Sequence, residues 1–224
     1  SYYGWRTNSS GQYVSDGGIV DGGDVPSSRY PTFYCAELAA KFIRGDDQVV
    51  AATSDNLLLA TYAVRQTDGA LNLLVLNKSS YTNLTAAFNL TGYVPSANAT
   101  VYSYGIPQDD AARTGIGSLD IAQTNFSGTS TNFNYVFPTY SATVLVLAPS
   151  APSLAPLASP PPSSGQFAFQ LQGQSDVPYV IQSSTNLTSP NWMAISTNTP
   201  VNGTLNLTNA ISSGSQFYRA VWQP

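Results

Sequence analysis

Residues 31 to 44 carry a helical pattern that constrains the whole fold, because its wide apolar side must pack against another surface. Pro31 suits the first turn, where its missing N–H would have no partner in any case. Apolar side chains then recur at three- and four-residue spacing, at Tyr34, Cys35, Leu38, Ala39, Phe42 and Ile43. Gly45 stands where a left-handed residue often ends a helix. We expect the stripe to fold back on the strands that follow, burying Leu38 and Phe42; the alternatives are that it pairs with a second copy or remains exposed.

From residue 48 onward the apolar pattern changes to a period of two, which is the period of a strand with one buried face. Two apolar runs flank Thr67-Asp68-Gly69, and Asp-Gly between such runs is a strong hairpin signal. Further strands are predicted in the segments NLTAAFNLT, ATVYSYG, NFNYVF and SATVLVLA. About seven or eight short strands of this kind indicate a β-sandwich over residues 48–148.

A proline-dense stretch, residues 149–165, follows the predicted sandwich, and its composition favours an extended, semi-rigid polyproline II linker. Beyond it, residues 166–224 contain about five more strand candidates, enough for a small C-terminal β-module. Residues 1–47 form the loop and helix that precede the sandwich. The expected fold class is therefore mainly β: a β-sandwich with one N-terminal helix, plus a second small β-sandwich-like domain.

The composition favours a secreted, extracellular β-protein and argues against several partners. Charged residues make up 9% of the chain, the net charge is −4, and eight Lys and Arg side chains cannot build a basic surface for nucleic acid. No apolar run is long enough to span a membrane. Cys35 is the single cysteine, and we expect it to be a small buried hydrophobe on the helix rather than a disulfide partner.

The sequence contains little that could act as a catalytic centre. It has no histidine, which removes the commonest general base and every Ser-His or Cys-His arrangement. Glu37 is the single glutamate, whereas glycoside hydrolysis usually needs two carboxylates. Asp109 and Asp110 lie near Arg113 in a predicted inter-strand loop, where ion-paired loop residues are the simpler interpretation. A glycosidase built from these aspartates stays an alternative.

Candidate metal sites are equally weak. Asp16, Asp21 and Asp24 stand among glycines and could supply oxygen ligands to calcium, but their spacing matches no EF-hand loop. Ordinary turns explain these aspartates as well. We therefore expect no metal site and no cofactor.

Aromatic side chains are the remaining candidates for binding, because exposed Trp and Tyr rings offer rigid, flat surfaces with a polar edge to sugar rings. Trp192 and Phe217 are expected in the core of the C-terminal module. Tyr218 and Trp222 would then point away from Phe217 if their strand is regular, and so could be exposed. The candidate sugar-contacting side chains are Trp222, Tyr218, Trp5 and Tyr3.

Three passages carry a resemblance to a known architecture: RYPTFYCAELAAKFIRGDDQVVAATSDNLLLATYAVRQTDGALNLLVLNKS, ATVYSYGIPQDDAARTG and FPTYSATVLVLAP. Together they resemble the passage from the last barrel helix into the C-terminal β-sandwich of bacterial (β/α)8-barrel glycoside hydrolases. The α-L-arabinofuranosidase and endoglucanase-xyloglucanase types are the most similar in style. The tail, with YVIQSSTNLTSPNWMAISTNT, is similar to a small β-module appended to many secreted bacterial proteins.

The resemblance implies that the helix is the last helix of a truncated barrel whose catalytic glutamates lie upstream, and no residue here matches either of them. We therefore expect a non-catalytic, carbohydrate-binding or structural C-terminal region of a secreted enzyme that degrades hemicellulose or other plant polysaccharides. Its expected partners are a cell-wall polysaccharide (β-glucan, xyloglucan or arabinoxylan) and the upstream catalytic barrel. A cell-surface adhesion or protein-contact module is the main alternative.

Overall fold

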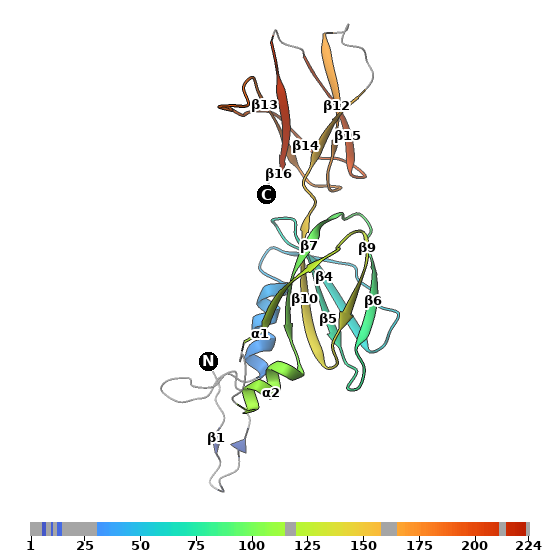
Figure 1. Ribbon diagram of the computed structural model, residues 1–224, viewed down its shortest axis with the longest axis vertical. Coiled ribbons are helices and arrows are strands. Elements are labelled where there is room, and N and C mark those ends of the chain that lie inside the picture. Colours follow the sequence, from blue (N-terminus) through green and yellow to red (C-terminus); the bar gives the residue numbers. More distant parts are fainter. Residues whose placement is uncertain are drawn as a thin grey trace. The chain divides into compact units, whose positions relative to one another are not determined.

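The computed structural model describes residues 6–7, 10, 13–14, 31–114, 120–157, 165–210 and 214–222. The chain divides into two compact units (Figure 1). Unit 1 comprises Ser1–Phe88, Asn98–Thr129 and Phe133–Leu147, and unit 2 comprises Asn89–Ala97, Ser130–Asn132 and Ala148–Pro224. Both are built mainly from β-strands, which confirms the predicted fold class. The predicted domain boundaries stay predictions.

The strands of the first part of the chain form a six-stranded sheet and two small sheets. The six-stranded sheet has the order β3 (Gln48–Val50), β4 (Leu59–Arg65), β5 (Leu71–Asn77), β10 (Ser141–Pro149), β7 (Pro95–Tyr104) and β8 (Ala122–Ser127). The small sheets pair β6 (Leu84–Asn89) with β9 (Asn132–Phe137), and β1 (Arg6–Thr7) with β2 (Tyr13–Val14). The predicted hairpin is confirmed, because β4 and β5 pair antiparallel across a turn in which Gly69 has a φ of 84°.

Helix α1 (Pro31–Phe42) covers one face of the six-stranded sheet (Figure 1). Strands β5 and β10 pair in register, and their even-numbered residues face α1, as Leu74 and Val144 do. The odd-numbered side chains lie on the opposite face and are 3% exposed or less at Leu73, Val75, Leu145 and Leu147. The two central strands are therefore buried on both faces, which explains why their sequences are almost continuously apolar.

The apolar stripe of α1 is buried within the chain, as predicted. Tyr34, Leu38 and Phe42 are 1%, 2% and 9% exposed and pack in one cluster with side chains of the sheet. Tyr34 also stacks on Tyr104, with 4.8 Å between the ring centroids. The stripe is narrower than expected: Cys35 is exposed, so its predicted burial is wrong. A sheet that packs on a helix contacts one row of side chains at four-residue spacing. The next row is turned by about 100° around the helix and so points away from the sheet.

The end of α1 is fixed by a strand rather than by a glycine. The buried side chain of Asn72, on β5, donates through Nδ2 to the carbonyl oxygens of Lys41 (3.0 Å) and Phe42 (2.9 Å). These are carbonyls that a helix leaves without internal partners. The left-handed residue is Asp46, with a φ of 70°, and the prediction of Gly45 for this role is wrong.

A second helix, α2 (Ile106–Thr114), replaces the loop predicted around Asp109 and Asp110. Gly105 accepts from the backbone N–H groups of Gln108 and Asp109, and the Gln108 Oε1 accepts from the Gly105 N–H at 3.0 Å. This reciprocal arrangement is one half of a capping box, with glycine at the N-cap. No helix among the described residues is long and apolar enough to cross a membrane.

Unit 2 contains two three-stranded sheets. One has the order β11 (Ser153–Pro156), β12 (Gln166–Gln172) and β15 (Thr204–Ala210), and the other has β14 (Met193–Asn198), β13 (Tyr179–Ser184) and β16 (Phe217–Trp222). The five strands predicted after residue 165 are all present. Strand β11 pairs with β12 inside the stretch predicted as polyproline II, because Leu154 joins the apolar cluster of the unit. That part of the linker prediction is wrong.

The apolar cluster of unit 2 lies between its two sheets. Its buried members are Phe169, Leu171, Val177, Tyr179 and Ile181. Tyr179 packs directly against Gly173, where a Cβ atom would lie 2.5 Å from the tyrosine Cε2. Position 173 therefore has room for glycine alone unless the ring moves.

Candidate carbohydrate-contacting surface

Of the predicted site residues, the structure describes Tyr218 and Trp222. Tyr3 and Trp5, and the calcium candidates Asp16, Asp21 and Asp24, lie outside the described residues. Among the described residues, no group of three or more His, Cys, Asp or Glu side chains is placed to hold a metal ion.

Tyr218 and Trp222 do point away from Phe217, but the face that they share is the inner face of unit 2. Both pack against the apolar cluster. Tyr218 stacks on Phe167 at 5.6 Å between ring centroids, and its hydroxyl accepts from Asn209 Nδ2 at 3.0 Å. Trp222 meets Tyr179 edge to face. The expected exposure of these two rings is therefore wrong, and their contact with sugar stays a prediction.

The alternation of β16 then places the complementary set of side chains on the outer face. Phe217, Arg219 and Val221 alternate with the inward-facing residues, so they belong to this outer face. Trp192 lies there too, since the guanidinium of Arg219 is 4.3 Å from its ring centroid. Phe217 and Trp192 were predicted as core residues, and that prediction is wrong. The other sheet of unit 2 covers the face of β16 that carries Tyr218 and Trp222, so the core lies on that side.

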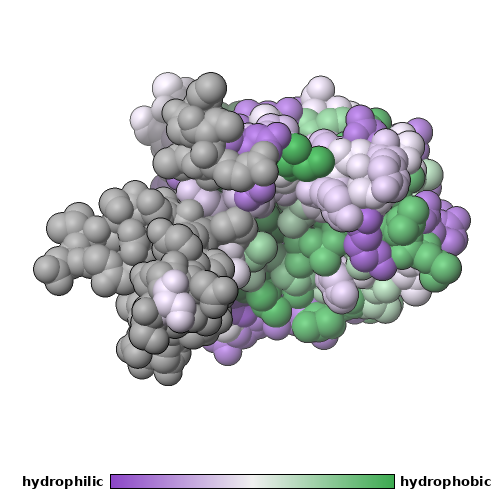
Figure 2. All heavy atoms as spheres, turned by 90° about the horizontal axis from the view of Figure 1, so that it is seen from below, coloured by the Kyte–Doolittle hydropathy of each residue, from purple (hydrophilic) through white to green (hydrophobic). Residues whose placement is uncertain are grey.

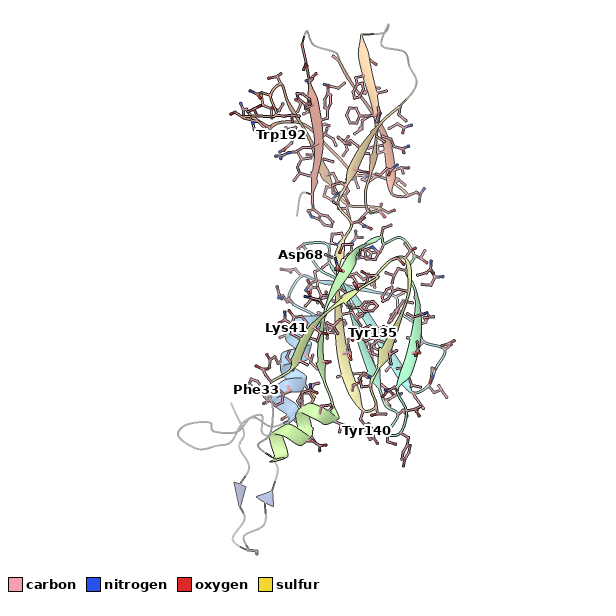
Figure 3. The ribbon with its side chains drawn as sticks, viewed as in Figure 1. Phe33, Lys41, Asp68, Tyr135, Tyr140 and Trp192 are labelled. Atoms are coloured by element: carbon pink, nitrogen blue, oxygen red, sulfur yellow. The ribbon has the colours of Figure 1, made fainter. Side chains whose placement is uncertain are left out.

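In unit 1, two strongly exposed tyrosines lie on loops at one end of the sandwich. Tyr81 is 93% exposed in loop 78–83, and Tyr140 is 57% exposed in loop 138–140. We call these two segments the tyrosine loops. Figure 3 labels Tyr140 at this end of unit 1, and Figure 2, which views the molecule from that end, shows apolar side chains exposed among polar ones.

The tyrosine loops are joined to one another by hydrogen bonds, so the two rings stand on a common support. The backbone N–H of Tyr140 donates to the carbonyl oxygen of Ser79 at 3.0 Å, and that of Thr139 donates to Asn83 Oδ1 at 3.1 Å. Ser79 Oγ accepts from the Tyr81 N–H at 3.4 Å. One residue, Ser79, therefore contacts the backbones of both exposed tyrosines.

Asn77 fixes the base of this surface. Its side chain is 2% exposed and donates through Nδ2 to three carbonyl oxygens, those of Thr82 (3.1 Å), Phe137 (3.0 Å) and Pro138 (2.8 Å). Its Oδ1 accepts from the Ser79 N–H at 2.9 Å. A buried amide with both ends bonded holds the loops in one arrangement before any ligand arrives.

Tyr140 adopts a left-handed backbone conformation, with a φ of 42°. Residues with a Cβ rarely occur in this region, and the conformation costs about 1 kcal/mol or more compared with glycine. The hydrogen bond to Ser79 holds the residue there. A strained tyrosine with an exposed ring is a feature that sequence periodicity does not reveal.

Asp109 and Asp110 do not converge on one point. They are successive residues of α2, where neighbouring side chains project about 100° apart. Asp109 is half-buried and accepts from the Tyr104 hydroxyl at 3.4 Å, whereas Asp110 is exposed. The paired carboxylates of a glycosidase instead flank one bond.

Burial, followed by the charge of Asp109, raises the pKa of Tyr104 from 10.0 to about 12. Burial also raises the pKa of Tyr135, which packs among the phenylalanines between the sheets. Both groups are neutral phenols at neutral pH. Tyr104 stacks on α1 through Tyr34, so its protonation state is coupled to the packing of the helix.

The elevated pKa of Tyr104 predicts a loss of stability in alkali. Because the folded-state pKa of about 12 exceeds the unfolded value of 10.0, the neutral phenol favours the folded state. This stability is present below pH 10 and is lost as the pH rises through the folded-state value. We expect the melting temperature of the Tyr104→Phe variant to fall less over this range than that of the parent. Equal slopes would contradict the assignment.

No protein-family model and no curated protein matches this chain. Solved structures of glycoside hydrolases are similar to part of it. The bifunctional glucanase-xylanase protein CelM2 from a metagenome library is 28% identical over 46% of this chain and 18% of its own, with a TM-score of 0.38. A Paenibacillus polymyxa xyloglucanase of glycoside hydrolase family 44 is 23% identical over 45% of this chain and 18% of its own, with a TM-score of 0.37. An arabinose-bound α-L-arabinofuranosidase is 21% identical over 59% of this chain and 21% of its own, with a TM-score of 0.46.

Proposed function

We propose that this chain is a non-catalytic ancillary region of a secreted enzyme that degrades plant polysaccharides, and that it binds polysaccharide through Tyr81 and Tyr140. The observation that carries the proposal is the pair of exposed rings, 93% and 57% exposed, on loops that hydrogen-bond to the same residue. The resemblance of the sequence to the end of a barrel glycoside hydrolase supports the parent enzyme class.

Exposed tyrosines on a fixed support suit sugar chemically. The face of a phenol ring packs on the C–H face of a pyranose, while the hydroxyl exchanges hydrogen bonds with sugar hydroxyls. Binding is weakened when loops must be ordered at the same time, and the Asn77 and Ser79 hydrogen bonds have already ordered these loops. The two rings lie near the ends of β5 and β9, which a single polysaccharide chain could cross.

The test is affinity electrophoresis of the whole chain on xyloglucan, arabinoxylan, β-glucan and cellulose. We expect retardation on at least one glycan, and a decrease in affinity of about tenfold for Tyr81→Ala, since a stacked ring contributes about 1 kcal/mol beyond its buried area. Tyr140→Gly should weaken binding similarly while leaving stability within about 1 kcal/mol, because glycine tolerates the left-handed backbone. Tyr62→Ala is the matched control, since Tyr62 is 52% exposed on β4.

Three results would contradict the proposal in whole or in part. Retardation by none of the glycans, together with capture of a defined protein from the cell envelope, would identify an adhesion or protein-contact module instead. Hydrolysis of aryl glycosides that is lost in Asp110→Asn would identify an enzyme. If binding persists unchanged in both tyrosine variants, the chain binds polysaccharide, but not at the tyrosine loops.

A further inference from the structure

Unit 2 is almost devoid of charge, and its one cation is held in a defined position. Its sequence contains two charged side chains, Asp176 and Arg219. Arg219 is exposed on β16, a strand whose inner face is apolar. A long cationic side chain on a neutral surface usually samples many rotamers, which costs entropy when a ligand fixes it.

Two contacts order the Arg219 side chain. Its Nε donates to Gln182 Oε1, on the neighbouring strand β13, at 2.8 Å. Its Cζ lies 4.3 Å from the ring centroid of Trp192, within the range of a cation–π contact. Figure 3 labels Trp192 in unit 2. Among the described residues, the terminal nitrogens Nη1 and Nη2 have no hydrogen-bond partner.

This geometry leaves one edge of the guanidinium available. The Nε edge is occupied by Gln182 and one face by Trp192, so the two terminal nitrogens form a planar fork of donors that are already oriented. A carboxylate matches this fork with two parallel hydrogen bonds, which are among the stronger hydrogen bonds in proteins. The half-exposed ring of Phe217, two residues earlier on the same face, adds an apolar contact beside the fork.

We propose that Arg219 binds the carboxylate of a uronic acid in an acidic plant polysaccharide, with Trp192 and Gln182 as positioning residues. A single cation flanked by aromatic and neutral polar side chains fits a ligand that carries one carboxylate on each sugar. The rings of Trp192 and Phe217 beside the guanidinium can pack on the C–H face of the sugar that carries the carboxylate, and an acidic peptide has no such face. The site is independent of the tyrosine loops, which lie in unit 1.

The test compares polygalacturonate with the same polymer after reduction of its carboxyl groups, using the whole chain at low salt. We expect the native polymer to bind about tenfold more tightly or better, and this preference to weaken as salt rises. Arg219→Gln should abolish the preference. Arg219→Lys should lose most of it, because an ammonium lacks the planar fork. Arg44→Gln is the control, since it removes the same charge from an exposed position in unit 1.

Tryptophan fluorescence of the unsubstituted chain tests the proposal even if the Arg219 variants fold poorly. Galacturonate oligomers should change the tryptophan fluorescence, and Trp192→Phe should remove that change. Equal affinity for the native and reduced polymers, or a preference that survives in Arg219→Gln, would overturn the proposal. Binding of polyglutamate as tight as that of polygalacturonate would indicate an acidic peptide ligand and overturn it too. Tyr81→Ala should leave the preference for the native polymer intact. A negative result for the Arg219 site can therefore be distinguished from a negative result for the tyrosine loops.

Discussion

Replacing Phe42 by alanine is expected to lower the free energy of unfolding of unit 1 by about 3 to 5 kcal/mol. Phe42 is 9% exposed, and it shares a cluster with Val64 and Val144 of the six-stranded sheet. The sheet is built from paired strands and cannot collapse easily into the space that the ring would leave. The loss includes both the transfer of the ring from water and the cavity that remains.

Ile43→Ala is the matched control for this experiment. Ile43 follows Phe42 directly but is 39% exposed, so its truncation should cost about 1 kcal/mol or less. Thermal and urea unfolding, followed by circular dichroism, would measure both variants. Suppose instead that Phe42→Ala melts like the parent and converts a dimer to a monomer in light scattering. The stripe would then be an interface between copies, and packing of α1 on its own sheet would be wrong.

The contrast between Phe42 and Cys35 indicates what sequence periodicity can predict. The three- and four-residue spacing correctly identified a helix and its central row, Tyr34, Leu38 and Phe42. It did not give the width of the buried stripe, since that depends on the shape of the surface opposite. Cys35 lies one row away and is exposed. The spacing of apolar residues predicts which side of a helix is buried. How wide the buried stripe is depends on the surface that packs against it.

The buried face of strand β16 also depends on residues that are distant in the sequence. Alternation correctly separated Tyr218 and Trp222 from Phe217, but each face of the strand carries at least one aromatic residue. Which face is inside was decided by Phe167 and Phe169 of β12, about fifty residues away in sequence. No local pattern contains that information.

The candidate surface at Tyr81 and Tyr140 could not be predicted for a related reason. Its geometry depends on hydrogen bonds such as that from Asn77 Nδ2 to the Phe137 carbonyl oxygen, which joins residues 60 positions apart. One local signal was available. The strand LNLLVLN is apolar except for Asn72 and Asn77, and a buried amide in a core strand must have partners.

Asn72→Asp is expected to be strongly destabilising, with a decrease in the free energy of unfolding of about 3 kcal/mol or more at pH 7. Asn72 is 0% exposed, and its Nδ2 donates to the last two carbonyl oxygens of α1 at 3.0 and 2.9 Å. Aspartate keeps the shape of the side chain but places a carboxylate oxygen against two carbonyl oxygens. It therefore removes two donors and buries a negative charge.

The pH dependence of this variant distinguishes the buried charge from a simple loss of hydrogen bonds. Burial beside carbonyl oxygens raises the folded-state pKa of the introduced carboxyl above its unfolded value of about 3.9. Protonation then favours the folded state, so the difference in melting temperature between parent and variant should shrink as the pH falls from 7 toward 4. Asn72→Leu loses the same donors without a charge, and its difference from the parent should be smaller at pH 7 and independent of pH. If Asn72→Asp and Asn72→Leu melt together at every pH, the amide does not hold the end of α1 through these carbonyls, and the helix is fixed by its apolar cluster alone.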